Sequence, residues 1–200
     1  MALLVGNDVL SNYTFEKEDE FEQVVVKLSD YVFGPQTIYL DIKKVMKSKN
    51  VASIPDGYLI DMTSAGDPKL YVIENEIVKH DPFKHIGIQM LKFATSFEES
   101  QTSIRGFLMN HISKDPDKLK RLEQGCKASN SRNIDHYLDK VVYNEFKGLV
   151  LIDEARPELH RVLEKINADI SVLEVKCFVS TTDNLHMNLI LYIKTMKNQK

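Results

Sequence analysis

Three acidic residues lie in two neighbouring apolar segments, where a half-buried strand would ordinarily carry none. Asp56 stands just before the segment GYLIDM, and Glu74 and Glu76 stand within KLYVIENE. Side chains alternate across a strand, so Glu74 and Glu76 would project from one face, about 7 Å apart along the chain. A hairpin between the two segments would bring Asp56 beside them. Three converging carboxylates repel one another unless a cation neutralises them.

The chemistry of these ligands indicates which cation would fit. Hard carboxylate oxygens favour Mg²⁺ or Mn²⁺ over zinc, and the two isolated cysteines, Cys126 and Cys177, form no zinc knuckle. Magnesium keeps several water positions and binds phosphate oxygens, as in metal-assisted phosphodiester hydrolysis. The alternative is that both segments lie at a sheet edge, where the acids are simply solvated.

The order of these residues resembles the PD-(D/E)xK nuclease superfamily, whose members have the restriction-endonuclease-like fold. In this pattern Asp56 closes the PD dipeptide, and Glu74 and Glu76 are the first and last residues of the (D/E)xK triplet, with 18 positions separating the two motif acids. The strand-like TIYLDIK and the run ENEIVKHDPFKHIGIQMLKF extend the resemblance to about residues 15–180. It implies a metal-dependent nuclease in which Asp56, Glu74 and Glu76 are catalytic and hold the metal.

The chain departs from the superfamily pattern at Glu76, where the usual residue is lysine. That lysine polarises the attacking water and stabilises the charged phosphate. The resemblance therefore implies that Glu76 acts as a metal ligand or general base, and that positive charge comes from Lys79, another lysine or a second metal ion. The alternative is a catalytically inactive nucleic-acid-binding or assembly module that keeps the fold.

Further residues near the motif gain possible roles from the resemblance. Gln89 would touch substrate or orient a catalytic water, and His80 and His85 would approach the phosphate. Glu22, four residues after Glu18 on the first predicted helix, would add a metal ligand. The alternatives are that His80 caps a helix, that His85 is an ordinary exposed histidine, and that the acids of the first helix are a solvated face.

A basic segment directly precedes the predicted PD strand. Lysines in such a segment could follow a phosphate backbone without reading its sequence. The predicted nucleic-acid contacts are Lys43, Lys44, Lys47, Lys49, Lys79, His80 and His85. The alternative is a solubilising surface.

A second segment, LEVK, spells the nuclease triplet better than ENE does. It contains Glu174 and Lys176. No PD hairpin precedes it, so we predict that it lies outside the active site.

The elements that must position these residues alternate between helix and strand, which predicts an α/β fold. The expected fold is a restriction-endonuclease-like mixed sheet flanked by helices, in one domain over 1–200, with a helical insertion at about 101–147. Expected helices are 15–32 (with Thr14 as N-cap), 81–97 and 157–166, expected strands are 37–42, 57–62, 70–77, 148–153 and 170–179, and 186–194 is either. The last strand–helix–strand should place two parallel strands in the sheet.

Composition limits the setting of this chemistry. The chain has 43% hydrophobic and 28% charged residues, a net charge of −3, and no apolar run of membrane-spanning length. We expect a cytoplasmic protein without membrane contact. The leading hypothesis is a Mg²⁺- or Mn²⁺-dependent endonuclease acting on DNA, and a homodimer is expected because many enzymes of this fold pair two active sites. A small-molecule phosphoesterase is a weaker hypothesis.

Overall fold

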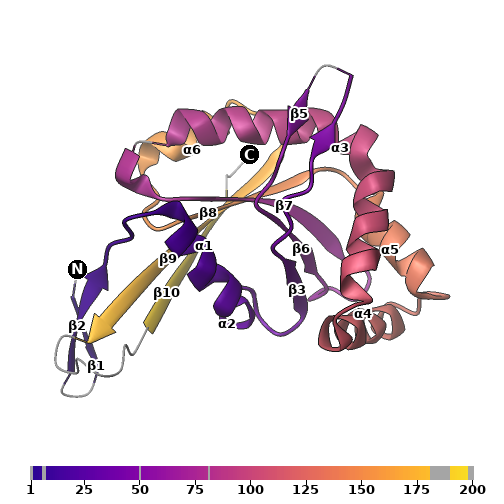
Figure 1. The fold of residues 1–200 in the computed structure, drawn as a ribbon, viewed down its shortest axis with the longest axis horizontal. Coiled ribbons are helices and arrows are strands. Elements are labelled where there is room, and N and C mark those ends of the chain that lie inside the picture. The colour runs from indigo at the N-terminus through magenta and orange to yellow at the C-terminus, as the bar shows by residue number, and fades with distance from the viewer. Residues whose placement is uncertain (1, 6–7, 50, 81, 181–189, 198–200) are drawn as a thin grey trace.

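A mixed β-sheet with helices on both faces forms the body of the molecule (Figure 1). The computed structural model describes residues 2–5, 8–49, 51–80, 82–180 and 190–197. The strands are β1 (Ala2–Val5), β2 (Asp8–Tyr13), β3 (Thr37–Leu40), β4 (Met46–Lys47), β5 (Ala52–Ser53), β6 (Gly57–Asp61), β7 (Lys69–Glu76), β8 (Lys147–Ile152), β9 (Asp169–Ser180) and β10 (Ile190–Lys197). The helices are α1 (Glu18–Lys27), α2 (Ser29–Phe33), the short 3₁₀ turn η1 (Val78–His80), α3 (Phe83–Ile112), α4 (Pro116–Ala128), α5 (Ile134–Val142) and α6 (Pro157–Leu163).

The main sheet has the strand order β1-β2-β9-β8-β7-β6-β3, and β10 also pairs with β9. The pairs β7–β8 and β8–β9 are parallel, whereas β6 pairs with β7 as an antiparallel hairpin. A helical crossover joins each parallel pair, because parallel neighbours cannot be connected by a tight turn. The structure therefore confirms a mixed α/β sheet flanked by helices and the predicted parallel pairing of the last strand–helix–strand unit.

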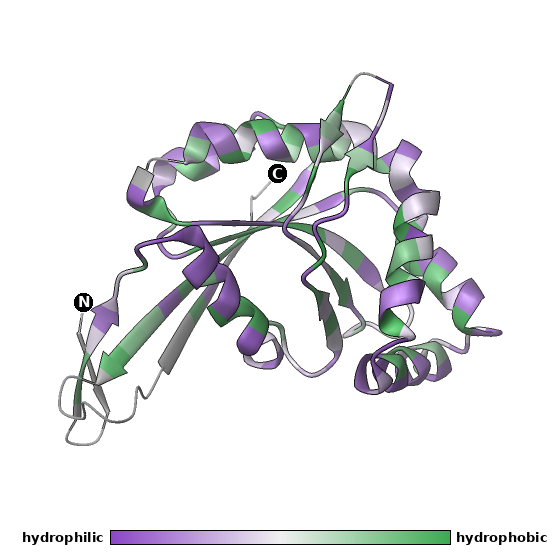
Figure 2. Ribbon diagram, in the orientation of Figure 1, coloured by the Kyte–Doolittle hydropathy of each residue, from purple (hydrophilic) through white to green (hydrophobic). Residues whose placement is uncertain are grey.

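Two hydrophobic layers cover opposite faces of the sheet. Helices α3 to α6 pack on the face that includes Val72, and α1 and α2 pack on the face that includes Ile73. Apolar and polar residues alternate along these helices (Figure 2), as expected for helices with one buried side. By the same alternation along β7, Glu74 and Glu76 lie on the face covered by α3. The fold thus turns both acids toward the N-terminal end of that helix.

The predicted helix over 15–32 is wrong in its bounds. It is two helices, α1 and α2, and Lys17 rather than Thr14 is the N-cap. The break falls at Leu28, whose backbone angles are not helical (φ −111°, ψ 19°). After this break, Val32 is buried and Tyr31 is 79% exposed.

The helix predicted to end near residue 97 continues to Ile112. Its buried face persists through Phe97, Ile104 and Leu108, so packing sustains the helix past the expected stop. The expected helical stretch at 101–147 therefore begins inside α3, and α4 and α5 follow.

The two ends of the chain add strands to the sheet. The hairpin β1–β2 was not predicted, and the ambiguous segment near the C-terminus contains the strand β10. Residues 186–189 of that segment lie outside the described part of the chain. None of the described helices combines the length and apolarity that a membrane span requires.

Candidate metal centre

The hairpin β6–β7 holds Asp56 against the acidic end of β7. The Asp56 main-chain N–H donates to the Ile73 carbonyl oxygen at 3.0 Å. The Asn75 N–H in turn donates to Asp56 Oδ2 at 2.8 Å. The first bond continues the hairpin pairing by one residue beyond β6, and the second holds the Asp56 carboxylate against β7. Asp56 therefore lies beside the strand that carries Glu74 and Glu76. The predicted hairpin is thus present with its acids at one end.

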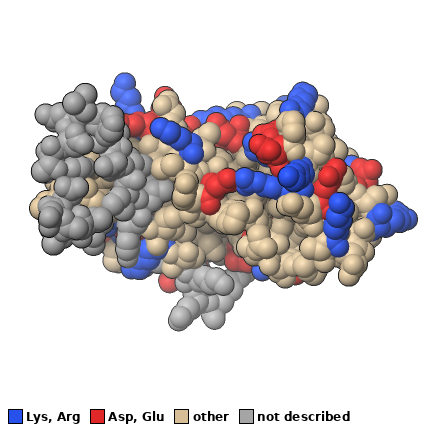
Figure 3. All heavy atoms as spheres, turned by 90° about the horizontal axis from the view of Figure 1, so that it is seen from below, with Lys and Arg blue, Asp and Glu red and all other residues tan. Residues whose placement is uncertain are grey.

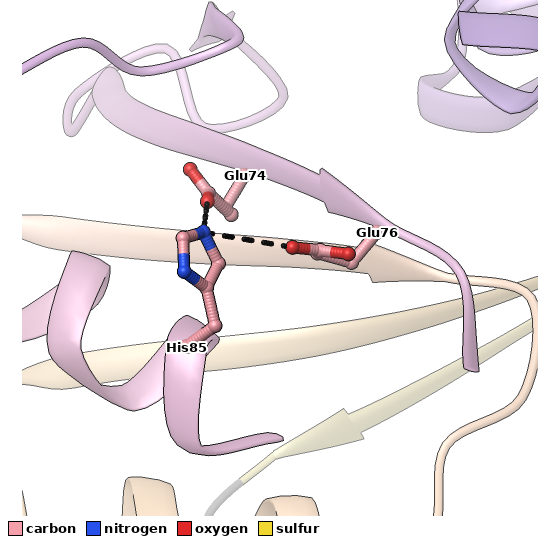
Figure 4. Close-up of side chains that lie close together, drawn as sticks. All are labelled: Glu74, Glu76 and His85. Carbon is pink, nitrogen blue, oxygen red and sulfur yellow. Dashed lines mark ion pairs between the residues drawn. The ribbon is translucent and has the colours of Figure 1, made fainter. Parts of the chain in front are cut away.

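Glu74, Glu76 and His85 form the first group of candidate ligands (Figure 4). His85 comes from the first turn of α3, and its Nε2 atom lies 3.8 Å from Glu74 Oε1 and 3.7 Å from Glu76 Oε1. Both glutamates are buried, whereas the imidazole is 60% exposed. One oxygen or nitrogen from each of the three residues falls within 4.8 Å of the others. The group is therefore anchored in the sheet and open to solvent on the helix side.

Glu18, Glu22 and Asp56 form the second group, again with ligand atoms within 4.8 Å of one another. The two glutamates come from α1, which packs on the opposite face of the sheet from α3. Lys43 lies among them, with its Nζ 2.9 and 3.0 Å from the two carboxylate oxygens of Glu22 and 3.5 Å from Asp56 Oδ1. Helix α1 thus brings two acids, and α3 an imidazole, to the same strand ends from the two faces of the sheet.

Burial and mutual repulsion make the acids at the strand ends hard to ionise. Burial raises the pKa of Glu74 to about 9, and the charges of Asp56 and Glu76 add to the effect. Burial also raises the pKa of Asp56 to about 7, despite its hydrogen bond from Asn75. The pKa of Glu76 rises to about 7 through burial and the charges of Glu18 and Asp56. A bound cation would reverse this balance by favouring the anionic forms.

The donor set fits a divalent cation. Glu74 is 4% exposed, and its Oε2 atom is buried with no hydrogen-bond partner. A buried oxygen without a partner is rare in folded proteins, and such an atom is well suited to coordinate an ion. Asp56, Glu74 and Glu76 offer the oxygen ligands that Mg²⁺ and Mn²⁺ take. Glu22 lies next to Asp56, as expected from the resemblance.

Among the lysines predicted to contact nucleic acid, Lys43 contacts the acids of the site. The other lysines lie elsewhere. Lys79 pairs with Glu16 and not with the acidic strand ends. Lys47 exchanges main-chain hydrogen bonds with the Ser100 hydroxyl, which fixes the hairpin β4–β5 against α3. Lys44 and Lys49 are exposed. The side chain of His80 lies outside the described residues, so its predicted role stays a prediction.

The charged side chains on one face of the molecule are mixed in sign. Figure 3 shows Lys and Arg interspersed with Asp and Glu, without a broad basic field. Any attraction for a polyanion on this face would therefore be local.

Gln89 lies one helical turn after His85, on the same side of α3. Its Oε1 atom is buried without a hydrogen-bond partner. The residue therefore has an acceptor available for a ligand or a water molecule.

The LEVK segment is a separate feature. Glu174 accepts from Lys176 Nζ at 2.6 Å and from the Ala155 N–H at 3.4 Å. Both partners lie away from β7, on β9 and in the segment before α6. Glu174 does not occur in either group of candidate ligands among the described residues.

The sequence predicts Lys43 only as a contact to the phosphate backbone of a nucleic acid. It favours Glu22 over Glu18 as an additional metal ligand. The structure groups Glu18 with Glu22 and Asp56 and places Lys43 at their centre. The i,i+4 spacing of the two glutamates was a usable signal. The position of Lys43 depends on how the chain leaves β3, which no local pattern encodes.

Comparison of the chain with family models, curated proteins and solved structures finds no match. The function is therefore inferred from the geometry of this site.

Proposed function

We propose that the chain is a divalent-cation-dependent nuclease that hydrolyses phosphodiester bonds, with DNA as its substrate and the restriction-endonuclease-like fold as its architecture. The observation that carries the proposal is that Glu74 and Glu76 share one group of candidate ligands at the end of β7, while Asp56 lies against the same strand end in a second group. One buried Glu74 oxygen has no partner. The antiparallel hairpin, followed by a helix and a parallel strand, agrees with the fold that the sequence resemblance implies.

The acids would act as cation ligands. Asp56, Glu74 and Glu76 would hold the ion, with Glu22 as a further candidate. A bound Mg²⁺ or Mn²⁺ would supply a water of lowered pKa and would neutralise charge on the phosphate oxygens. The hydrogen bond from the Asn75 N–H fixes the Asp56 carboxylate, so this ligand would be oriented before a cation arrives.

Lys43 takes the place of the positive charge that is missing at Glu76. Its ammonium group lies between Glu22 and Asp56, and its side chain is half exposed. When a cation neutralises the acids, this ammonium is positioned to contact a phosphate oxygen of the substrate. Gln89, with its free acceptor, would accept a hydrogen bond from a water or a base at the margin of the same site.

One observation favours the second candidate, a nuclease-like module that binds nucleic acid without cutting it. The Lys43 ion pairs neutralise part of the acidic group without a metal. A protein that has lost catalysis could keep such a lysine as a permanent substitute for the cation.

The direct test is incubation of the pure, EDTA-treated protein with single- and double-stranded DNA and RNA, each with Mg²⁺, Mn²⁺ or EDTA. Cleavage of DNA with metal, and none with EDTA, is expected. The Asp56→Asn variant is the control for a contaminating nuclease, because it removes a ligand and nearly preserves volume. Binding of DNA without cleavage under any metal would favour the second candidate.

A further inference from the structure

The two ligand groups differ in chemistry, and this difference has consequences for metal choice. The Glu18–Glu22–Asp56 group offers oxygen only, and Lys43 already lies against it. The Glu74–Glu76–His85 group offers two carboxylates and an imidazole nitrogen. Magnesium strongly prefers oxygen, whereas first-row transition metals accept imidazole readily. The nitrogen is therefore the feature that separates the two groups.

The distances around His85 are too long for hydrogen bonds and are close to those between two ligands of one ion. Its Nε2 lies nearly equidistant from Glu74 Oε1 and Glu76 Oε1, at 3.8 and 3.7 Å. These separations exceed the roughly 2.7–3.2 Å of a hydrogen bond. Two ligands of one ion, each about 2.1 Å from it, lie roughly 3 to 3.5 Å apart. A small rotation of the exposed imidazole would close the difference.

A second observation is a buried carboxylate oxygen without a partner on one of the three residues. Glu74 is buried, and its Oε2 atom has no partner. In Figure 4 one Glu74 oxygen approaches the imidazole while the other is turned away from it. The side chain thus presents one oxygen to the nitrogen-containing group and keeps a second, unsatisfied oxygen.

We propose that Glu74, Glu76 and His85 form a site for a first-row transition-metal cation that binds in preference to Mg²⁺, with His85 as the ligand that sets the preference. The proposal deepens the proposed function, because it names the cation class of the same centre. Its test, however, measures binding and requires no catalysis.

The alternative role for His85 is electrostatic. A protonated imidazole would partly neutralise the two glutamates, and its removal would then leave the site more negative. The two roles predict opposite signs when the imidazole is removed. If His85 is a ligand, its removal weakens metal binding. If it is only a positive charge, its removal strengthens metal binding.

The experiment is calorimetric titration of the EDTA-treated protein with Mg²⁺, Mn²⁺ and Co²⁺. Wild-type affinity should rise from Mg²⁺ through Mn²⁺ to Co²⁺, following the order for nitrogen-containing sites. In His85→Ala the Co²⁺ affinity should fall by roughly 10- to 100-fold, while the Mg²⁺ affinity changes by less than about threefold. The Co²⁺ absorption spectrum should also change, because it reports loss of a nitrogen ligand.

His111→Ala is the matched control, because His111 is an exposed histidine on the same helix, bonded through Nδ1 to the Phe107 carbonyl oxygen. It should leave all three affinities unchanged. Equal or tighter Co²⁺ binding by His85→Ala would overturn the proposal, and so would the absence of any Co²⁺ preference in the wild type. Cleavage of DNA that persists alongside either result would retain the proposed nuclease function. His85-dependent Co²⁺ binding without cleavage would support the site while removing the nuclease function.

Discussion

Two strands of the same sheet carry a buried glutamate in a nuclease-like triplet, yet their surroundings differ. On β9, Glu174 is 7% exposed and is held by Lys176 and the Ala155 N–H. On β7, Glu74 is similarly buried, its neighbours are other acids and the exposed imidazole of His85, and one of its oxygens has no partner. Burial alone therefore does not distinguish a structural acid from a functional one. What distinguishes them is whether the fold supplies the neutralising partner or leaves that position for a ligand.

Each region also contains a lysine, and these lysines are placed differently. Lys176 is mostly covered and lies 2.6 Å from Glu174. Lys43 is half exposed, and its Nζ lies 2.9 and 3.0 Å from the Glu22 oxygens and 3.5 Å from Asp56 Oδ1. An exposed ammonium can exchange its partner for a phosphate oxygen, whereas a covered one contributes mainly to the fold.

The largest expected effect is on catalysis. Glu74→Gln or Asp56→Asn should reduce metal-dependent DNA cleavage by roughly 10³-fold, because each removes an anionic ligand worth several kcal/mol to the transition state. Glu174→Gln should leave cleavage within about threefold of wild type. Initial rates on a labelled duplex with saturating Mg²⁺ or Mn²⁺ measure both. Equal losses in the Glu74 and Glu174 variants would remove the distinction between the two strands.

The second effect is on the pH dependence of stability without metal. In the folded protein the pKa values of Asp56 and Glu76 are raised to about 7 and that of Glu74 to about 9. Because folded values exceed the unfolded ones, these acids contribute stability below about pH 4 that is lost as pH rises through 7 and 9. One pKa unit corresponds to about 1.4 kcal/mol, so the total loss should reach several kcal/mol.

Urea unfolding in EDTA at pH 5, 7 and 9 measures this loss. In Glu74→Gln the decline between pH 7 and 9 should flatten, whereas Glu174→Gln should keep the wild-type slope. Saturating Mn²⁺ should reduce the decline in the wild type, because the metal binds the anionic forms. Stability that rises from pH 5 to 9 in EDTA would show that the acids of β7 are neutralised by the protein itself.

A third effect separates the two glutamates at a fixed pH. At pH 7 without metal, residue 74 ionises in the unfolded chain but stays largely protonated in the folded one, because its pKa there is about 9. Glu74→Gln removes the free-energy cost of that protonation and should raise the free energy of unfolding by about 1 to 3 kcal/mol. Glu174→Gln removes the carboxylate from Lys176 and should lower it by about 1 to 3 kcal/mol. Chemical denaturation of the two variants side by side makes the comparison. If Glu74→Gln lost more free energy of unfolding than Glu174→Gln, Glu74 would be the acid that stabilises the fold.

The smallest expected effect concerns the two lysines. Lys43→Ala should slow DNA cleavage by about tenfold, equivalent to about 1.4 kcal/mol, with little change in urea midpoint. Lys176→Ala should lower the midpoint and leave cleavage nearly unchanged. Lys49→Ala, an exposed lysine next to the hairpin β4–β5, controls for a general loss of positive charge. A Lys49 variant as slow as the Lys43 variant would reduce Lys43 to one member of a diffuse basic surface.

The local features on which the site depends can be read from short stretches of the sequence. Period-two apolar patterns placed β6 and β7 to within a residue, and the strict alternation of side chains put Glu74 and Glu76 on one face. The strand expected at 148–153 is β8, a continuous apolar run that is buried on both faces. These features depend on a few neighbouring residues, so a local sequence pattern is enough to predict them.

The groups that surround the acids, by contrast, are set by long-range packing. Lys43 meets Glu22 and Asp56 across 21 and 13 residues of chain, and Lys79, expected in the site, pairs with Glu16 instead. The break between α1 and α2 and the extension of α3 to Ile112 depend on packing against the sheet. Long-range contacts of this kind are fixed by the simultaneous packing of several elements on the sheet. A short stretch of sequence therefore does not predict which charged side chains become neighbours in the fold.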